Sequence, residues 1–217
     1  MKTLIDKASW YRREHFQFFS ALDEPFHGIV AEVDCTAAYR QCKQQHTSFF
    51  LRYLHDTLRA VSQVPELRYR VEGDAIADYT IIHASATIMR PDHSFGFCPI
   101  EFHADFDQFS ASAKAAMNAV IAAQGLCFSE AGERSDAIHF SAMPWIRFSG
   151  ITHARQHKGP DSIPKISVGK CTEQNGRISM PVATFVHHGL ADAYHIHLFL
   201  QALETALSER AAAPSIR

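Results

Sequence analysis

The sequence of 217 residues predicts an α+β fold, a two-layer α/β sandwich in which helices flank a mixed, largely antiparallel sheet. Apolar residues recur at helical spacing in several long segments, and short runs rich in β-branched and aromatic residues lie between them. Some of these runs follow one another across turn sequences, whereas others stand beside helices. This combination favours a mixed or mostly antiparallel sheet.

Four elements are expected in the first third of the chain. They are a short helix over 10–20, a strand over 26–34 and two helices over 36–45 and 48–64. Asp34 and Thr36 provide side-chain oxygens that can cap the helix over 36–45. The helix over 48–64 has its apolar residues at helical spacing, and Pro65 ends it.

Strands are more frequent in the remainder of the chain. The expected segments are strands over 68–72, 75–77, 80–89 and 94–102, a helix over 106–123, a strand over 137–142, an irregular polar segment over 149–163, strands over 166–172 and 177–186, a helix over 196–208 and a loose tail over 211–217. Gly73-Asp74 is typical of a hairpin turn. Asn175-Gly176 is a strong signal for a type I′ turn, so the strands on either side of it are expected to pair.

The composition indicates one globular domain over residues 1–217, since the chain contains no repeat, low-complexity stretch or linker. A net charge of -2 provides no basic field for nucleic acid, and no run of ~18 apolar residues predicts a membrane span. The five cysteines form no C-x-x-C pair, and charges interrupt the apolar residues of the N-terminus, unlike a signal peptide. A cytoplasmic protein with reduced thiols is therefore expected. Sixteen phenylalanines indicate a core or pocket with much aromatic surface.

Two adjacent histidines and an aspartate lie at an expected strand-to-helix junction near the C-terminus. The residues from Met180 to Phe185 are apolar, as in a buried strand, and apolar residues recur with helical period over 196–207. Between these segments, His188 precedes Asp192 by four residues. Because an imidazole takes up a proton near neutral pH, His188 is a candidate general base with Asp192 as its structural support.

Two other interpretations of these residues remain open at the level of sequence. Asp192 would also be favoured at a helix N-terminus simply because the helix dipole stabilises a negative charge there. His188, Asp192 and His195 fall near positions i, i+4 and i+7, the spacing of a metal site on one helical face. Against a metal site, His188 is expected before the helix begins, and 14 histidines make chance clusters common.

Several motifs occur in a fixed order along the chain. They are Trp-x-Arg-Arg-Glu-His-Phe at 10–16, Pro-Glu-Leu-Arg at 65–68, Ser-Phe-Gly-Phe-Cys-Pro at 94–99, Ser-Ala-Met-Pro-Trp-Ile-x-Phe at 141–148, Ile-Pro-Lys-Ile-Ser-x-Gly-Lys at 163–170 and His-His-x-x-x-Asp at 187–192. With these motifs, the chain resembles the chloramphenicol acetyltransferase family from near residue 10 to about residue 207. Each motif alone is weak, but chance does not produce all of them in order.

The resemblance implies a CoA-dependent acyltransferase fold and an O-acetyltransferase that acts on a hydroxyl of chloramphenicol or a similar xenobiotic. Acetyl-CoA would be the co-substrate, with no metal. The resemblance also implies a homotrimer with active sites between neighbouring subunits, and neither a nucleic-acid nor a membrane partner. His188 would take the proton from the acceptor hydroxyl, and Asp192 would be a strut paired with Arg12.

The resemblance assigns aromatic residues to the acceptor pocket and two further residues to the CoA site. The acceptor residues are Phe18, Phe19, Phe95 and Phe148, and the CoA residues are Lys170 and Cys171. Phe19 replaces a tyrosine that some members use, which removes one hydroxyl. Cys171 stands where many members have a tyrosine, so a stacking surface for the adenine is expected to be absent.

Two departures from the family pattern put efficient turnover in doubt. Gly150 stands where the family has a serine that stabilises the oxyanion, and losing one such donor typically lowers the rate ~10²–10³-fold. Ser167 keeps a hydroxyl that could hold a water near the intermediate. Ala193 replaces a common glycine and would be strained at a positive φ. Three hypotheses follow: a slow chloramphenicol O-acetyltransferase, the same chemistry on another hydroxylated acceptor, or a catalytically weakened ligand-binding trimer.

Overall fold

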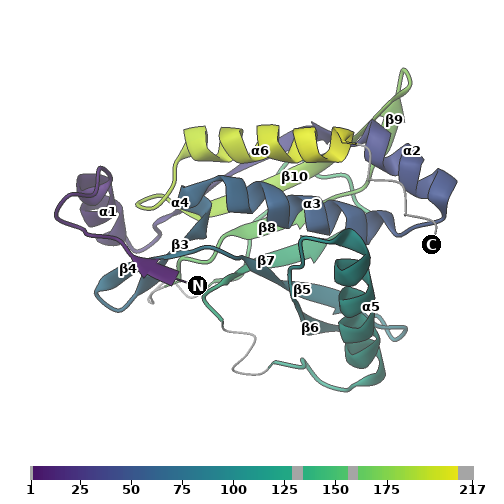
Figure 1. The fold of residues 1–217 in the computed structure, drawn as a ribbon, viewed down its shortest axis with the longest axis horizontal. Coiled ribbons are helices and arrows are strands. Elements are labelled where there is room, and N and C mark those ends of the chain that lie inside the picture. Colours follow the sequence, from purple (N-terminus) through teal and green to yellow (C-terminus); the bar gives the residue numbers. More distant parts are fainter. Residues whose placement is uncertain (1, 129–133, 156–160, 210–217) are drawn as a thin grey trace.

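A computed structural model describes residues 2–128, 134–155 and 161–209 of the chain (Figure 1). The helices are α1 (Arg13–Ser20), α2 (Thr36–Gln45), α3 (Phe49–Gln63), α4 (Pro65–Arg68), α5 (Phe106–Ala122) and α6 (Ala193–Ser208). The strands are β1 (Lys2–Leu4), β2 (Phe26–Asp34), β3 (Tyr69–Glu72), β4 (Ala75–Tyr79), β5 (His83–Met89), β6 (Phe95–Ile100), β7 (Ala137–Ala142), β8 (Lys165–Val168), β9 (Thr172–Gln174) and β10 (Arg177–His187).

The main sheet has the strand order β2-β10-β8-β7-β5-β6, and β9 pairs with β10 beyond the end of β8. The β5–β7 and β7–β8 ladders are parallel, whereas the other ladders are antiparallel. The predicted mixed, largely antiparallel sheet is therefore confirmed. The strands β1, β4 and β3 form a separate, smaller sheet.

The helices α3 and α6 lie side by side across one face of the main sheet, with α5 beside β6 (Figure 1). Leu54 of α3, Phe199 of α6 and Phe140 of β7 are almost completely buried in one apolar core between these layers. Side chains alternate between the two faces of a strand, so His139 and Ser141 point to the face of β7 opposite Phe140. The polar residues His139 and Ser141 of β7 are thus on the face of the sheet that is turned away from this core.

The expected single strand over 166–172 is wrong, because the chain leaves the ladder between β8 and β9. The amide of Gly169 donates to the carbonyl oxygen of Pro181 at 2.9 Å, but Pro181 has no N–H to donate in return. The next amide, that of Lys170, donates to the carbonyl oxygen of Ile146 at 2.8 Å instead. The hairpin itself is present, with positive φ angles at both Asn175 and Gly176, as a type I′ turn requires.

Other element boundaries differ by a few residues from those expected. The first helix begins at Arg13 instead of residue 10, and the last begins at Ala193 instead of residue 196. The short elements β1 and α4 have too few residues for a periodic pattern and were not expected. Among the described residues, no helix is both long and apolar enough to cross a bilayer.

Candidate active site

The connection between β10 and α6 holds the two histidines and the aspartate in a tight turn. The amides of Leu190 and Ala191 both donate to the carbonyl oxygen of His187, at 2.9 and 3.0 Å. Asp192 is the N-cap of α6, and its Oδ1 accepts from the amide of Tyr194 at 3.0 Å. Ala193 is the first helical residue and has no positive φ, so alanine in place of glycine causes no backbone strain here.

Arg12 joins this turn to the N-terminal segment from a fully buried position. Its Nη1 donates to Asp192 Oδ2 at 2.7 Å, and its Nη2 donates to the carbonyl oxygen of His188 at 3.0 Å. Its Nε lies 3.4 Å from the carbonyl oxygen of Gly189. Burial alone would raise the pKa of Asp192, but the hydrogen bond from Arg12 and the charges of His195 and Arg12 lower it to about 2. The ion pair is therefore present across the neutral range.

The ring of His188 is held between two other rings. It stacks on Phe19 with a centroid distance of 3.9 Å and an interplanar angle of 8°, and it lies 4.1 Å from the ring of His27. Its amide donates to the carbonyl oxygen of Pro25 at 2.7 Å. The Nδ1 atom is buried and has no hydrogen-bond partner among the described residues. Arg12, paired with Asp192, thus supports the backbone of His188, and the flanking rings fix the imidazole plane.

His187 has a different role from its neighbour. Its Nδ1 accepts from the amide of Gly189 at 3.1 Å, and its ring packs 5.9 Å from the rings of Phe16 and Phe26. Burial lowers the pKa of His187 to about 4, so this ring is neutral near pH 7. His187 therefore acts as a packed structural residue of the junction.

The metal interpretation finds no geometric support in the described residues. His195 Nδ1 lies 3.1 Å from the amide nitrogen of Asp192, which completes a capping box at the start of α6. The side chains of Asp192 and His195 are therefore both engaged in capping α6. In the described ranges, no group of three or more His, Cys, Asp or Glu side chains is arranged to hold a metal ion.

A cleft of about 980 Å³ opens at the other end of the main sheet. Its walls come from α3, α5, β5, β7 and the segments that follow β7 and β8, and they include Phe95, Ser141, Trp145, Lys170 and Cys171. The two residues assigned to CoA thus share this cleft with one of the four acceptor residues. Its lining does not include His188.

The His188 group and the cleft lie far apart on a single chain. Val182 of β10 is paired with Val168 at the end of β8, next to the cleft, and His188 directly follows the last residue of β10, six residues further along the chain. Six residues of strand span about 20 Å. In Figure 1, α1 and the start of α6 accordingly lie at one end of the sheet, and α2 with the β9–β10 hairpin lies at the other.

Hydroxyl groups meet where β7 and β8 run in parallel beside the cleft. Ser141 and Ser167 are paired across this ladder, and Thr87 Oγ1 donates to Ser141 Oγ at 3.2 Å. His153 Nε2 lies 2.9 Å from Ser167 Oγ. Sequence reasoning missed Ser141, although it belongs to the Ser-Ala-Met-Pro-Trp motif, because strand pairing alone places it beside Ser167. Gly150 lies in an exposed segment, and a Cβ built on it would meet no atom of the described part of the chain within 4 Å.

The four expected acceptor residues fall into three places. Phe18 and Phe19 project from α1, where Phe19 stacks on His188 and Phe18 is 64% exposed. Phe95 lines the cleft. Phe148 packs against the backbone of Gly169, where it would lie 2.8 Å from an added Cβ. Of the four, the structure thus places Phe18 and Phe19 near His188, the candidate base.

A charged group surrounds Phe26, next to the His188 junction. The guanidinium of Arg155 lies 4.3 Å from the centroid of Phe26, and Lys165 Nζ lies 4.8 Å from it. Arg155 pairs with Glu24, and Lys165 Nζ donates to Asp161 Oδ2 at 2.7 Å. Burial lowers the pKa values of both cations. This largely buried charged group was not expected from the sequence.

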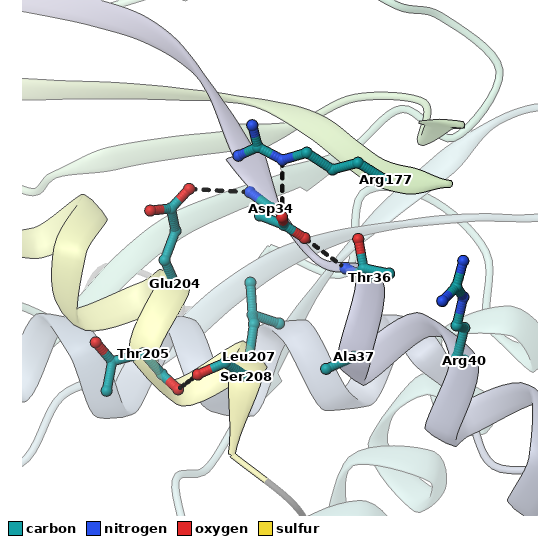
Figure 2. A pocket seen from close by; sticks show the side chains of 9 residues that line it. All are labelled: Asp34, Thr36, Ala37, Arg40, Arg177, Glu204, Thr205, Leu207 and Ser208. Carbon is teal, nitrogen blue, oxygen red and sulfur yellow. Dashed lines mark hydrogen bonds and ion pairs between the residues drawn. The ribbon is translucent and has the colours of Figure 1, made fainter. Parts of the chain in front are cut away.

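A second hollow, of about 640 Å³, lies between α2, the start of β10 and the end of α6 (Figure 2). Asp34 accepts from Arg177 Nε at 2.7 Å and from the amide of Thr36 at 2.9 Å. Glu204 Oε1 accepts from the amide of Asp34 at 3.0 Å, and Arg40 donates to the carbonyl oxygen of Gly176 at 2.9 Å. Its charged side chains therefore bond to the protein itself, and we assign no site to this hollow.

Comparison with known proteins gives consistent matches over almost the whole chain. The family model described as "Chloramphenicol acetyltransferase" matches residues 1–204. A chloramphenicol acetyltransferase of Escherichia coli is 24% identical over 208 residues, covering 95% of this chain and 94% of that protein. A chloramphenicol acetyltransferase of Bacillus pumilus is 26% identical over 196 residues, covering 90% and 89%.

The fold is also similar to solved structures. A chloramphenicol acetyltransferase structure superposes with a TM-score of 0.88 and 32% identity, covering 95% of this chain and all of that chain. The cubic core of the pyruvate dehydrogenase multienzyme complex superposes with a TM-score of 0.62 and 15% identity, covering 90% and 86%. The second likeness is one of fold alone.

Proposed function

Because the chain belongs to the chloramphenicol acetyltransferase family and is an acyltransferase, we propose that it transfers an acetyl group from acetyl-CoA to a hydroxyl of chloramphenicol or a similar small molecule. The observation that carries this proposal is the imidazole of His188, fixed between Phe19 and His27 on a backbone that Arg12 holds. A base held in one orientation can meet an acceptor hydroxyl without reorganisation.

In the proposed reaction, the acceptor oxygen attacks the carbonyl carbon of the thioester while His188 takes the proton of the hydroxyl. The C–S bond of the tetrahedral intermediate then breaks, and the leaving CoA thiolate takes up the proton that His188 holds. Both substrates meet in one site, so no acyl-enzyme is required. General-base assistance of this kind contributes ~10²–10⁴-fold to the rate.

Ser141 and Ser167 are the proposed partners of the oxyanion. They lie on neighbouring parallel strands and on the same face; Ser141 lines the cleft, and Ser167 is buried directly beside it. Two hydroxyls at this position can donate to the oxyanion directly or through a water, as effective catalysis of acyl transfer requires. On this proposal the donors are Ser141 and Ser167, so the absence of a hydroxyl at Gly150 need not leave the oxyanion without a donor.

The cleft beside these serines is the proposed site of acetyl-CoA. Lys170 at its rim offers a cation for phosphate oxygens, and Trp145 offers an aromatic surface. Transfer requires reacting atoms about 3–3.5 Å apart, yet His188 is about 20 Å from the cleft on the same chain. The active site therefore combines His188 of one subunit with the cleft of another, in a homotrimer.

A thiol-release assay with acetyl-CoA and chloramphenicol tests the proposal. CoA thiol should appear only when both substrates are present, and His188→Ala should lower the rate about 10²–10⁴-fold. His15→Ala is the matched control, because His15 is exposed on α1 and is not part of the site. Absence of thiol release while acetyl-CoA still binds would contradict turnover of chloramphenicol and leave a ligand-binding trimer.

The charged group around Phe26 favours a second candidate acceptor. Glu24 and Asp161, the carboxylates that pair with the buried Arg155 and Lys165, remain partly exposed next to the His188 junction, where a purely apolar acceptor would have to desolvate them. A more polar hydroxylated acceptor would instead hydrogen-bond to them. The test compares kcat/KM for thiol release with polar alcohols and with chloramphenicol. A higher value with polar alcohols would support this second candidate.

A further inference from the structure

Two cysteines that are distant in the sequence meet at the wall of the cleft. Cys35 is the N-cap residue of α2, and Cys171 lies in the connection between β8 and β9. Their Sγ atoms are 3.9 Å apart. All five cysteines are free thiols, but this contact between two of them lies beside a cleft large enough for a ligand.

The two thiols differ in access. Cys171 is half-buried and lines the cleft, whereas Cys35 is only 1% exposed and its Sγ lies 3.5 Å from the carbonyl oxygen of Ile178. Geometry allows either thiol to donate in the Sγ–Sγ contact, but the deeper burial of Cys35 keeps its proton there. A reagent in the cleft can therefore reach Cys171 first, with Cys35 directly behind it.

The same contact makes the two thiols unequal as nucleophiles. The hydrogen bond from Cys35 lowers the pKa of Cys171, against burial and the charge of Glu32, which raise it. That hydrogen bond and burial raise the pKa of Cys35. An accessible thiol of lowered pKa next to a second thiol is the arrangement of an attacking and a resolving cysteine.

We propose that Cys171 and Cys35 form a reactive thiol pair that reduces a small-molecule disulfide bound in the cleft, specifically CoA disulfide, and closes to a protein disulfide. Only the identity of the disulfide rests on the proposed function, because the cleft is the proposed site of acetyl-CoA. The thiol pair itself stands on the Sγ–Sγ contact and on the exposure of Cys171 to the cleft.

The reaction consists of two exchanges that balance. The thiolate of Cys171 attacks one sulfur of CoA disulfide, which forms a Cys171–CoA mixed disulfide and releases one CoA thiolate. Cys35 then loses its proton and attacks the Cys171 sulfur, which forms the Cys35–Cys171 disulfide and releases the second CoA. Two protein thiols are oxidised and one CoA disulfide is reduced to two CoA thiols. The Sγ atoms must approach each other by only about 2 Å.

Closure would alter the cleft, because the disulfide ties the β8–β9 connection to the start of α2. Lys170 precedes Cys171 directly and also lines the cleft. Oxidation should therefore change the KM of the transfer reaction for acetyl-CoA, and a reductant should restore the original KM. This places a reversible redox control at the cosubstrate site.

The experiment treats the reduced full-length protein with CoA disulfide and, in parallel, with glutathione disulfide. Peptide mapping by mass spectrometry should find Cys35 linked to Cys171, with free thiols falling from the five of the reduced chain to three. Cys35→Ser should stop at a Cys171–CoA adduct, and Cys171→Ser should form neither product. Cys42→Ser is the matched control, since Cys42 is another buried cysteine of α2 outside the contact, and should react like the parent.

The outcomes separate the thiol pair from the identity of its oxidant. A rate at least about tenfold higher with CoA disulfide than with glutathione disulfide would support the whole proposal, because binding in the cleft raises the effective concentration. Equal rates with both disulfides would support the thiol pair and overturn the role of CoA. No Cys35–Cys171 link with either disulfide, in a protein whose thermal unfolding is that of the folded chain, would overturn the proposal, whatever the acetyltransferase assay gives.

Discussion

Arg12 shows how one residue can organise a site without contacting the reacting atoms. Its guanidinium binds the carbonyl oxygen of His188, approaches that of Gly189 and binds the carboxylate of Asp192, so it holds both ends of the turn that carries the base. Arginine suits this position because its planar fork offers several donors in fixed directions. The position of His188 therefore depends on a side chain from the other end of the sequence.

Replacement of Asp192 by asparagine tests this support. Asn still caps α6, but it leaves the buried Arg12 without its anion. We therefore expect the free energy of unfolding to fall by about 1–3 kcal/mol, a loss intermediate between those for breaking a surface ion pair and a buried one. Asp105→Asn is the control, because Asp105 caps α5 without an ion pair. Urea unfolding of both variants measures the difference, and equal stability would contradict the role of the ion pair.

Substitutions at Ser141 and at Gly150 are expected to differ in their effect on kcat, because the two positions differ in their proposed role toward the oxyanion. Ser141→Ala should lower kcat about 10²-fold or more with little change in stability, because it removes a hydroxyl beside Ser167. Gly150→Ser should leave kcat unchanged, since position 150 faces open space. Steady-state kinetics of both variants with acetyl-CoA decide between them. A gain in rate for Gly150→Ser would restore the interpretation based on the family pattern.

At the scale of elements, the break between β8 and β9 shapes the cleft. Gly169 leaves the ladder where Pro181 has no amide hydrogen, and the following residues form the cleft wall. A Cβ built on Gly169 would lie 2.6 Å from Pro181, 2.8 Å from Phe148 and 2.9 Å from the carbonyl oxygen of Ile146. Only glycine fits this close contact, so the break is a fixed feature of the fold.

Gly169→Ala should therefore destabilise the protein by about 1–3 kcal/mol, as expected for an overpacked position. It should also raise the KM for acetyl-CoA, because Lys170 and Cys171 would move. Gly150→Ala provides the control, because the added methyl meets no described atom within 4 Å. In addition, Gly150 does not have a positive φ, so alanine is not strained there. Thermal unfolding and KM measurements on the two variants test this, and a fully stable Gly169→Ala protein would show that the segment can shift freely.

The junction between β10 and α6 should also respond to acid. Burial holds His187 neutral by lowering its pKa to about 4, so the unfolded chain, with a pKa near 6.5, binds the proton more readily. Stability from this residue is thus complete above about pH 6.5 and is lost as the pH falls toward 4, by up to about 3 kcal/mol. His187→Gln keeps an acceptor for the amide of Gly189 but cannot titrate, so its urea unfolding should depend less on pH over this range. An unchanged pH dependence would contradict a buried, neutral His187.

At the scale of the whole molecule, His188, the proposed base, and the cleft occupy opposite ends of the main sheet. This separation of about 20 Å follows from the register of β10 with β8 and is too large for acetyl transfer within one chain. An assembly that sets the His188 end of one subunit against the cleft of the next would complete three equivalent sites by symmetry.

Mixing two inactive variants tests this arrangement. His188→Ala lacks the base and Ser141→Ala lacks the hydroxyl of the cleft, so each homotrimer should be nearly inactive. In trimers refolded from an equal mixture, a site is intact when a His188-bearing chain meets a Ser141-bearing neighbour, which gives about one quarter of the wild-type activity. No recovery, with mixed trimers demonstrated by mass, would mean that each site lies within one chain.

The sequence by itself determined most of the elements and the candidate residues of the junction between β10 and α6. Helical periodicity, Pro65, the turn at Asn175-Gly176 and the capping position of Asp192 are local signals, because they depend on neighbours within a few residues. The ordered motifs were sufficient to indicate the family, the candidate base and the pairing of Arg12 with Asp192, and the structure brings Arg12 and Asp192 into contact.

Only the tertiary structure decided which distant residues meet. The pairing of Ser141 with Ser167, the contact of Cys35 with Cys171 and the separation of His188 from the cleft all depend on strand order and register. Strand order and register are set by the burial of apolar surface over the whole sheet, to which each residue contributes a small part. No local pattern can therefore encode them, and for this reason Gly150 was selected from the sequence whereas Ser141 was found only in the fold.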